Sequence, residues 1–249
     1  MDTTILIVIV SVFLLAGTVK GVIGLGLPTV SLALMTVVTD LPTAMAVLLV
    51  PSFVTNFWQA AVGGHGRDIV RRIWPFLLLA TVTVWIGAMA LTQIDLSNLS
   101  ALLGGSLVTY ALISLAGLRV TLGESQEVWL GPLVGTVNGV LTGMTGSFVV
   151  PGVMYLQSLG LSRDELVQAM GWLFTASTLA LAVALGGNNL LSMDLGIMSA
   201  TGLIPAMLGM VIGQRIRQSL SEQLFRRVFF TALLVLGLYI IANALALFG

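Results

Sequence analysis

The chain of 249 residues is too apolar for a soluble protein. Apolar residues make up 57% of it and charged residues 8%, with ten basic and ten acidic side chains, whereas a soluble domain carries about 25% charged residues. This composition excludes a soluble enzyme, a disordered chain and a nucleic-acid-binding protein. The chain has no cysteine and one histidine, which excludes disulfides, thiolate and histidine-rich metal sites and a cysteine nucleophile. We expect no metal, no cofactor and no catalytic residue.

Long runs without charge predict the membrane segments. Most of these runs have the length that a helix needs to cross about 30 Å of hydrocarbon. The run 128–162 is too long for one crossing and is interrupted by Gly143 and Gly146, so we interpret it as two segments, which gives ten in all. Pro51 and Pro205 are predicted to kink the third and ninth segments. The runs cover residues 3–19, 21–39, 41–66, 73–94, 96–118, 128–162, 166–193, 195–214 and 228–249.

The first segment has only Asp2 before it and no basic residue. A cleaved signal peptide begins with a basic region, so we expect this segment to be retained as a helix.

The arginines predict the orientation in the membrane. Lysine and arginine are concentrated in cytoplasmic loops. If the ten segments alternate with the N-terminus outside, the loops 3–4, 5–6, 7–8 and 9–10 are cytoplasmic and hold every arginine of the chain: Arg67, Arg71, Arg72, Arg119, Arg163, Arg215, Arg217, Arg226 and Arg227. We therefore predict a multi-pass protein of a prokaryotic inner (plasma) membrane with both termini outside. The orientation is the same if segments 1–2 and 6–7 are re-entrant hairpins.

The two halves of the chain resemble each other. Residues 17–22, Gly-Thr-Val-Lys-Gly-Val, recur at 135–140 as Gly-Thr-Val-Asn-Gly-Val, and Gly63-Gly64 matches Gly186-Gly187. We interpret this as a duplication within one membrane domain, with a first transmembrane repeat at 1–120 and a second at 125–249.

Five segments per repeat is an odd number, so the second repeat is predicted to be inverted relative to the first. The charges agree, because the loop 3–4 is basic and its counterpart at 187–194 is not. The predicted fold class is an all-α polytopic membrane protein, an inverted repeat of two five-segment halves with broken or re-entrant helices at segments 1–2 and 6–7.

A lysine within the first segment is the leading candidate for the functional site. In inverted-repeat transporters the site lies where glycine or proline interrupts matching helices of both repeats. Lys20 is the only lysine of the chain and the only cation inside an apolar run. Because a cation at membrane depth is costly, we predict that Lys20 is the countercharge of an anionic substrate. The alternative is that Lys20 extends to the lipid headgroups.

The other candidate residues surround the two breaks. Broken helices expose N–H groups and a partly positive end, which suits an anion. Asn56 and Gln59, in the third segment, are candidates to line the path, with an interhelical hydrogen bond as the alternative. For the residues at the breaks the alternative is helix packing by small side chains. These residues are Gly21, Gly24 and Gly26 at the first break, and Asn138, Gly139, Thr142, Gly143, Thr145, Gly146 and Ser147 at the second.

The glycine spacing resembles that of a known family. Gly17-x3-Gly21-x2-Gly24-x-Gly26-x-Pro28 recurs as Gly135-x3-Gly139-x3-Gly143-x2-Gly146-x4-Pro151. The pattern, over nearly the whole chain, is similar to that of the TauE/SafE family of membrane permeases. The resemblance implies a secondary transporter of small anions with sulfur oxyanion or carboxylate groups, such as sulfite or organosulfonates.

We therefore expect a permease that moves a small anion by alternating access. An anion channel is the alternative, since it would share the repeat without substrate-coupled exchange. An intramembrane enzyme is disfavoured, because Ser147 has no base nearby in the sequence. The expected partners are the anionic substrate and membrane lipid, without nucleic acid. A coupling proton or other ion, and a homodimer, stay open.

Overall fold

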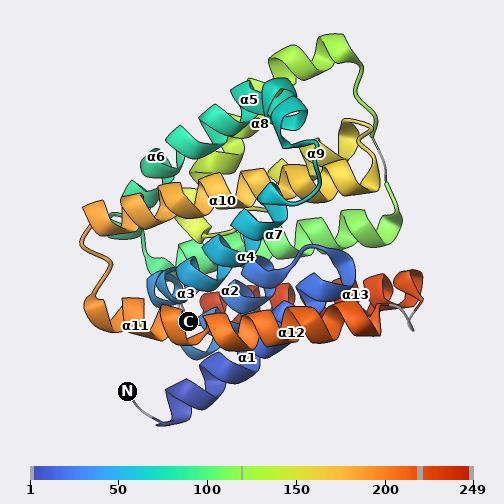
Figure 1. Cartoon of the computed structure of the whole chain (residues 1–249). Coiled ribbons are helices and arrows are strands. Elements are labelled where there is room, and N and C mark those ends of the chain that lie inside the picture. The colour runs from blue at the N-terminus through green and yellow to red at the C-terminus, as the bar shows by residue number, and fades with distance from the viewer. Residues whose placement is uncertain (1–2, 119, 218–220, 247–249) are drawn as a thin grey trace.

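The computed structural model describes residues 3–118, 120–217 and 221–246, and the structured elements in these ranges are all helices (Figure 1). Arg119, one of the arginines used for the orientation, lies outside the described residues. The helices are α1 (Thr3–Ile23), α2 (Leu27–Val38), α3 (Leu41–Val47), α4 (Leu49–Ala61), α5 (Gly66–Val82), α6 (Val84–Ala88), the 3-10 helix η1 (Met89–Thr92), α7 (Leu96–Ala116), α8 (Glu124–Thr145), α9 (Gly152–Ser158), α10 (Arg163–Gly187), α11 (Met193–Thr201), α12 (Leu203–Ile216) and α13 (Glu222–Ala246).

The fold is that of a polytopic membrane protein, which confirms the predicted all-α class. Within the described ranges, six helical stretches are long and apolar enough to cross a membrane, and the bent pair α3–α4 makes a seventh if it counts as one span. Helices α2 and α9 have 12 and 7 residues, about 18 and 10 Å at 1.5 Å per residue. Both are too short to cross the hydrocarbon alone, so two of the ten predicted segments do not span by themselves.

Glycine breaks the chain at both predicted positions. Between α1 and α2, Gly24 and Gly26 have φ of 80° and 110°. Helix α8 ends at Thr145, and Gly146 follows with a φ of 73°. Residues other than glycine rarely adopt these left-handed conformations. The sequence therefore ends α1 and α8 inside apolar runs and lets α2 and α9 begin after a change of direction.

Two prolines interrupt further helices. α3 gives way to α4 at Leu48, and α11 gives way to α12 at Gly202, each three residues before Pro51 or Pro205. Proline lacks the N–H that would bond to the carbonyl four residues back, and its ring crowds that carbonyl. The first interruption bends the chain by 46°, as predicted for the third segment.

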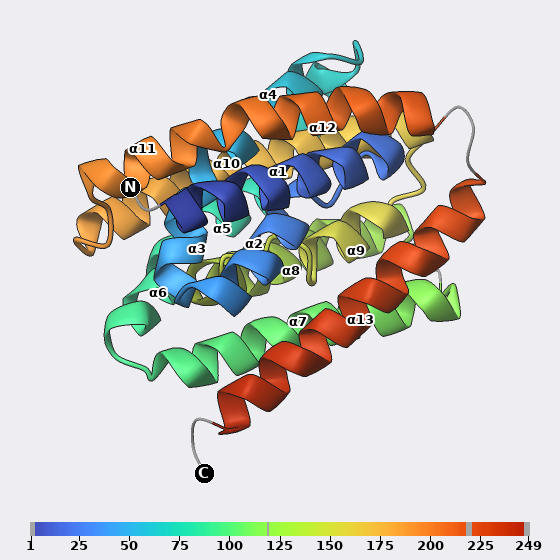
Figure 2. The same cartoon turned by 90° about the horizontal axis from the view of Figure 1, so that it is seen from below.

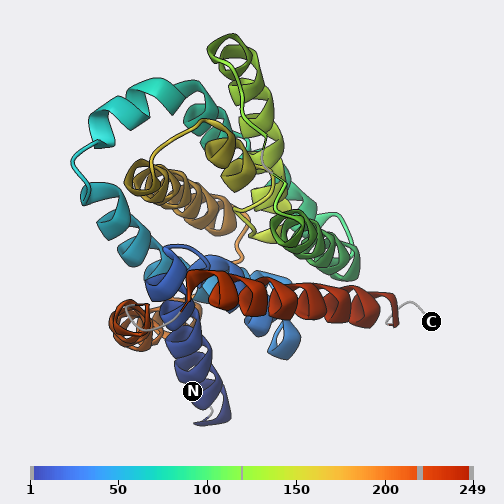
Figure 3. The ribbon, with the colours of Figure 1, turned by 90° about the vertical axis from the view of Figure 1, so that its right-hand side faces the viewer.

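The main helix pairs each join one helix from 1–120 with one from 125–249. α1 packs along α12, α8 along α5 and α6, α4 against α10, and α7 against α13. Figure 2 shows α1 beside α12 and α7 beside α13, and Figure 3 gives the view from the right-hand side of Figure 1. A Cβ atom at Gly17 or Gly209 would collide with a carbonyl oxygen across the α1–α12 contact, so backbone touches backbone there.

The loops fall into two groups at opposite ends of the bundle. In Figures 1 and 2 the connections α4–α5, α7–α8, α9–α10 and α12–α13 lie toward the right, and the connections α6–α7 and α10–α11 lie toward the left. The helix ends at the right carry the arginines, for example Arg67 at the start of α5 and Arg163 at the start of α10. We call this the arginine end. Its assignment to the cytoplasm stays a prediction.

Candidate functional site

Lys20 points into the protein. Its ammonium, carried by α1, donates to Thr55 Oγ1 of α4 at 3.3 Å and to Asn56 Oδ1 beside it. The residue is 4% exposed. In this conformation Lys20 therefore does not reach toward headgroups. Its bond to Asn56 joins α1 to α4, which is the interhelical hydrogen bond given above as the alternative for Asn56. A place for Asn56 on the substrate path stays a prediction.

Lys20 has no carboxylate partner among the side chains that the structure describes. Among the residues whose side chains are described, no aspartate or glutamate is buried, and none forms an ion pair with Lys20. Burying a charge is costly unless an opposite charge and hydrogen bonds accompany it. Thr55 and Asn56 supply neutral oxygen atoms only, so the site has one positive charge in excess.

Free hydrogen-bond donors lie on the α4 side of the site. Asn56 Oδ1 accepts the hydrogen bond from Lys20, and Asn56 Nδ2 is buried without a partner among the described residues. Ser52 lies one turn earlier on the same face of α4, and its hydroxyl is also buried without a partner. Buried donors are nearly always satisfied, so these two groups fit a ligand that accepts hydrogen bonds.

The second break repeats this pattern at Asn138. Its Oδ1 accepts from the N–H of Gly152 at 2.9 Å, at the start of α9. Because the partner is a donor, the oxygen must face it, and Asn138 Nδ2 is left buried without a partner. The hydroxyl of Ser147 is in the same state. Asn138 and Ser147 at the second break, like Asn56 and Ser52 on α4, thus each present a buried donor without a partner among the described residues.

Thr142 and Thr145 shape the backbone of the second break. Thr142 Oγ1 donates to the carbonyl of Ser147 at 3.0 Å, and the N–H of Ser147 donates to Thr145 Oγ1 at 3.2 Å. Both threonines are fully buried. These bonds take up the polar groups of the irregular backbone, which is tolerated in a membrane only when it is buried or lines a cavity.

The predicted glycines divide into two groups. Gly21, Gly139 and Gly143 lie against atoms of neighbouring helices that leave no room for a Cβ atom, so they have a packing role. Gly24, Gly26 and Gly146 are instead the left-handed residues of the two breaks. A contact with substrate stays a prediction for both groups.

Helix α10 borders both breaks. A Cβ atom at Gly24 would lie 3.3 Å from Val167, and one at Gly152 would lie 3.0 Å from Leu173. Ser177, one turn further along α10, has a buried hydroxyl without a partner. No hydrogen bond between described residues joins Lys20 to Asn138, so the two breaks supply separate sets of polar groups beside the same helix.

Sequence reasoning missed Ser52, Thr55 and Ser177. A signal was present, because Ser52 and Thr55 recur as Thr175 and Thr178 at the offset of 123 that relates Gly63 to Gly186. Polar residues repeated at the same spacing in two apolar segments would have added α4 and α10 to the site.

Two glutamines join α4 to α10, and we call them the glutamine clasp. Gln59 Nε2 donates to the carbonyl of Val167 at 2.6 Å, and Gln168 Nε2 donates to the carbonyl of Ala60 at 2.8 Å. Gln168 Oε1 also accepts from the N–H of His65 at 3.1 Å. Gln59 lies one turn beyond Asn56 toward the arginine end, so the clasp lies between Lys20 and that end. Gln59 thus forms the interhelical bond considered as the alternative, and Gln168 was missed.

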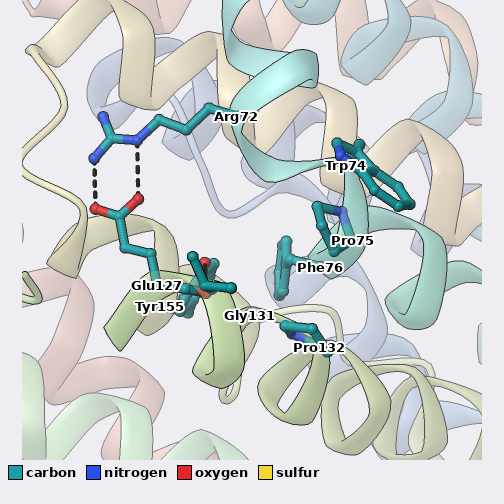
Figure 4. A pocket seen from close by; sticks show the side chains of 9 residues that line it. Arg72, Trp74, Pro75, Phe76, Glu127, Gly131, Pro132 and Tyr155 are labelled. Carbon is teal, nitrogen blue, oxygen red and sulfur yellow. Dashed lines mark hydrogen bonds and ion pairs between the residues drawn. The ribbon is translucent and has the colours of Figure 1, made fainter. Parts of the chain in front are cut away.

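A separate cavity opens near the arginine end (Figure 4). It has a volume of about 540 Å³ and is lined by residues of α5, α8 and α9. Arg72 donates to both carboxylate oxygens of Glu127, at 3.0 and 2.6 Å, and to the carbonyl of Leu159 at 2.9 Å. Arg72 therefore connects α5 to α8 and to the end of α9. Lys20 and Asn138 do not line this cavity.

These features define a class of protein: a polytopic α-helical membrane protein with a buried cation beside two broken helices. The family model described as sulfite exporter TauE/SafE matches residues 9–240, and the chain therefore belongs to the TauE/SafE family. This places it among membrane transporters of the sulfite and anion type. Comparison with curated proteins and comparison with solved structures gave no match.

Proposed function

We propose that the protein is a secondary transporter that carries a small anion, a sulfur oxyanion, organosulfonate or carboxylate, by alternating access. Lys20 provides the countercharge. The observation that carries this proposal is the buried ammonium between α1 and α4, which has two hydrogen bonds to neutral oxygens and no carboxylate partner among the described residues.

The polar groups favour an anion over a cation or a neutral solute. Asn56 and Asn138 use their oxygens internally and leave amide donors free, and Ser52 and Ser147 have hydroxyls without partners. A sulfonate or carboxylate offers several acceptor oxygens, and bonds between charged oxygens and such donors are stronger than neutral ones. A cationic substrate would instead be repelled by Lys20.

Reciprocal packing supports the proposal of two inverted repeats at 1–120 and 125–249. In an inverted repeat, a contact between two helices recurs with the halves exchanged. α1 packs on α12, and its counterpart α8 packs on α5 and α6, the counterparts of α11 and α12. The common position of the arginine-bearing helix ends supports the proposed orientation, with both termini outside.

Alternating access is favoured over a channel by the burial of Lys20. The residue is 4% exposed, and the glutamine clasp lies between it and the arginine end. In an alternating-access carrier, these contacts would open to admit an anion from the arginine end. A channel would instead need a continuous path, with at most a narrow gate.

The test is exchange in lipid vesicles that contain the purified protein. Labelled sulfite, or a labelled organosulfonate or carboxylate, should enter faster when the same unlabelled anion is present inside, because the loaded carrier returns more readily. Lys20→Met should abolish uptake, whereas Arg67→Met, which removes an exposed cation, should not.

If the Lys20→Met variant exchanges the anion at the wild-type rate, the proposed site is wrong. Uptake that follows membrane voltage without acceleration by internal anion would favour the channel.

A further inference from the structure

We propose that the Lys20 site accepts its substrate as a monoanion and discriminates against dianions of the same size. This inference rests on the proposed function and adds the charge state of the substrate. A methyl sulfate or hydrogen sulfite ion fits this rule, whereas sulfate and fully ionised sulfite do not.

The argument begins with the number of buried charges. Lys20 is the only charged side chain among the described residues that are buried. One monoanion beside it gives a neutral pair. A dianion would leave one negative charge uncompensated in a region of low dielectric constant, and a buried charge without a partner is strongly unfavourable.

Neighbouring ionisable groups add no buried charge to that of Lys20 and its anion. Helices α2 and α4 have no ionisable side chain, Asp194 lies in the first turn of α11, and Arg215 lies in the last turn of α12. The described ionisable side chains of α10 and α13 are Arg163, Asp164, Glu165, Arg226, Arg227 and Tyr239, and none of them is buried.

The uncharged groups cannot balance a second negative charge. The free donors of Asn56 and Asn138 form hydrogen bonds but carry no net charge. The N-terminus of a helix contributes about half a positive charge at most, and only α2 offers one beside the first break. In α9 the N–H of Gly152 is already bonded to Asn138. A dianion would therefore remain undercompensated by about half a charge or more.

The charge rule also bears on the coupling ion. Sulfite changes from hydrogen sulfite to its dianion by losing one proton. If the site admits only hydrogen sulfite, each transported ion carries its own proton across the membrane. The described residues include no buried carboxylate that could carry a proton separately. Hydrogen sulfite would then carry a proton across the membrane, in addition to any proton carried by the amine of Lys20.

The first experiment compares methyl sulfate with sulfate, two ions of similar shape that carry one and two negative charges at all working pH values. Binding is measured as thermal stabilisation of the detergent-purified protein, which rises with ligand occupancy. We expect methyl sulfate to stabilise the wild type and sulfate to bind at least about tenfold more weakly, because a buried unpaired charge is unfavourable. Lys20→Met should lose the response to methyl sulfate, and Lys20→Arg should retain part of it.

The second experiment measures sulfite binding across pH, with methyl sulfate as the control. The apparent affinity for total sulfite should fall by about tenfold per pH unit above the pKa of hydrogen sulfite, because only the protonated fraction binds. Methyl sulfate does not titrate, so any change in its affinity with pH measures titration of Lys20 itself. The charge rule predicts that the affinity for total sulfite falls more steeply with pH than the affinity for methyl sulfate.

The outcomes separate the two proposals. Equal binding of sulfate and methyl sulfate, or sulfite binding that weakens with pH no more than methyl sulfate binding does, would overturn the charge rule and leave an anion site in place. If no anion in either set binds, the proposed function fails as well.

Discussion

The contact between α7 and α13 makes a quantitative prediction with an internal control. Gly104 and Gly105 are neighbours in α7. A Cβ atom at Gly104 would lie 2.7 Å from the carbonyl oxygen of Gly237 and 2.8 Å from Ile241 Cγ1, whereas one at Gly105 would meet nothing within 4 Å. Ordinary contacts begin at 3.4 Å, so Gly104→Ala must move α13 away by about 0.6–0.7 Å or distort its side chains.

The expected cost follows from comparing the two variants. Both gain helix propensity, about 1 kcal/mol for glycine to alanine. Gly104→Ala alone overfills a packed contact, which typically costs about 1–3 kcal/mol. The difference in stability between Gly104→Ala and Gly105→Ala should therefore be about 1–3 kcal/mol, and each kcal/mol corresponds to about 2–4 °C in Tm for a chain of this length.

The assay is thermal unfolding of the three purified proteins in one detergent, with Gly105→Ala expected at or slightly above the wild-type Tm. Equal Tm values for the two alanine variants would refute the reasoning. A second arm adds Gly237→Ala, whose Cβ atom would lie 2.9 Å from the carbonyl oxygen of Gly104. Because one separation of α7 and α13 relieves both clashes, the double variant should lose less than the sum of the single losses. Strict additivity would contradict a shared contact.

Three further predictions concern the site and the arginine end. Asn138→Ala should cost about 1–3 kcal/mol, because the first N–H of α9 loses its buried acceptor, and it should weaken anion stabilisation; an unchanged Tm would contradict the bond. Gln168→Leu removes one side of the clasp. Since the chain has no cysteine, Ser52→Cys provides a single thiol, and a thiol reagent should label it faster in the presence of Gln168→Leu. An unchanged labelling rate would show that the clasp does not limit access. Glu127→Gln should lower stability by about 1 kcal/mol or less, because the side chain of its partner Arg72 is 41% exposed. The loss should shrink in high salt, which screens exposed charges. A larger loss at all salt concentrations would contradict this treatment of the pair as a solvent-screened surface ion pair.

The helix breaks could be predicted from the sequence because their cause is local. Gly24, Gly26 and Gly146 adopt backbone conformations that other residues avoid, and Pro51 and Pro205 act on the turn before them. The number of crossings was not predictable in the same way. An apolar run has the same hydropathy whether its helix fills the run or, as in α2 and α9, only part of it.

The candidate site was easiest to predict where a single residue carries the signal. Lys20 stood out because a cation in an apolar run is costly wherever it points. Its partner Thr55 and the clasp residue Gln168 lie far from it in sequence, and their residue types are common in membrane helices as packing groups. Their roles depend on which helices meet, and the glycine pattern predicts close contacts without naming the partner helix.

The pairing of α1 with α12 has a consequence for synthesis. Gly17 fits only against the backbone near Ala206, about 190 residues later, which at roughly 5–20 residues per second takes about 10–40 s. During that time the glycine face of the first helix lacks the partner against which it packs. Residues 1–120 therefore cannot complete their helix contacts before the later helices are made. Expressed alone, residues 1–120 would keep unfilled glycine faces on α1 and on α5–α6, because these faces pack on α12 and α8.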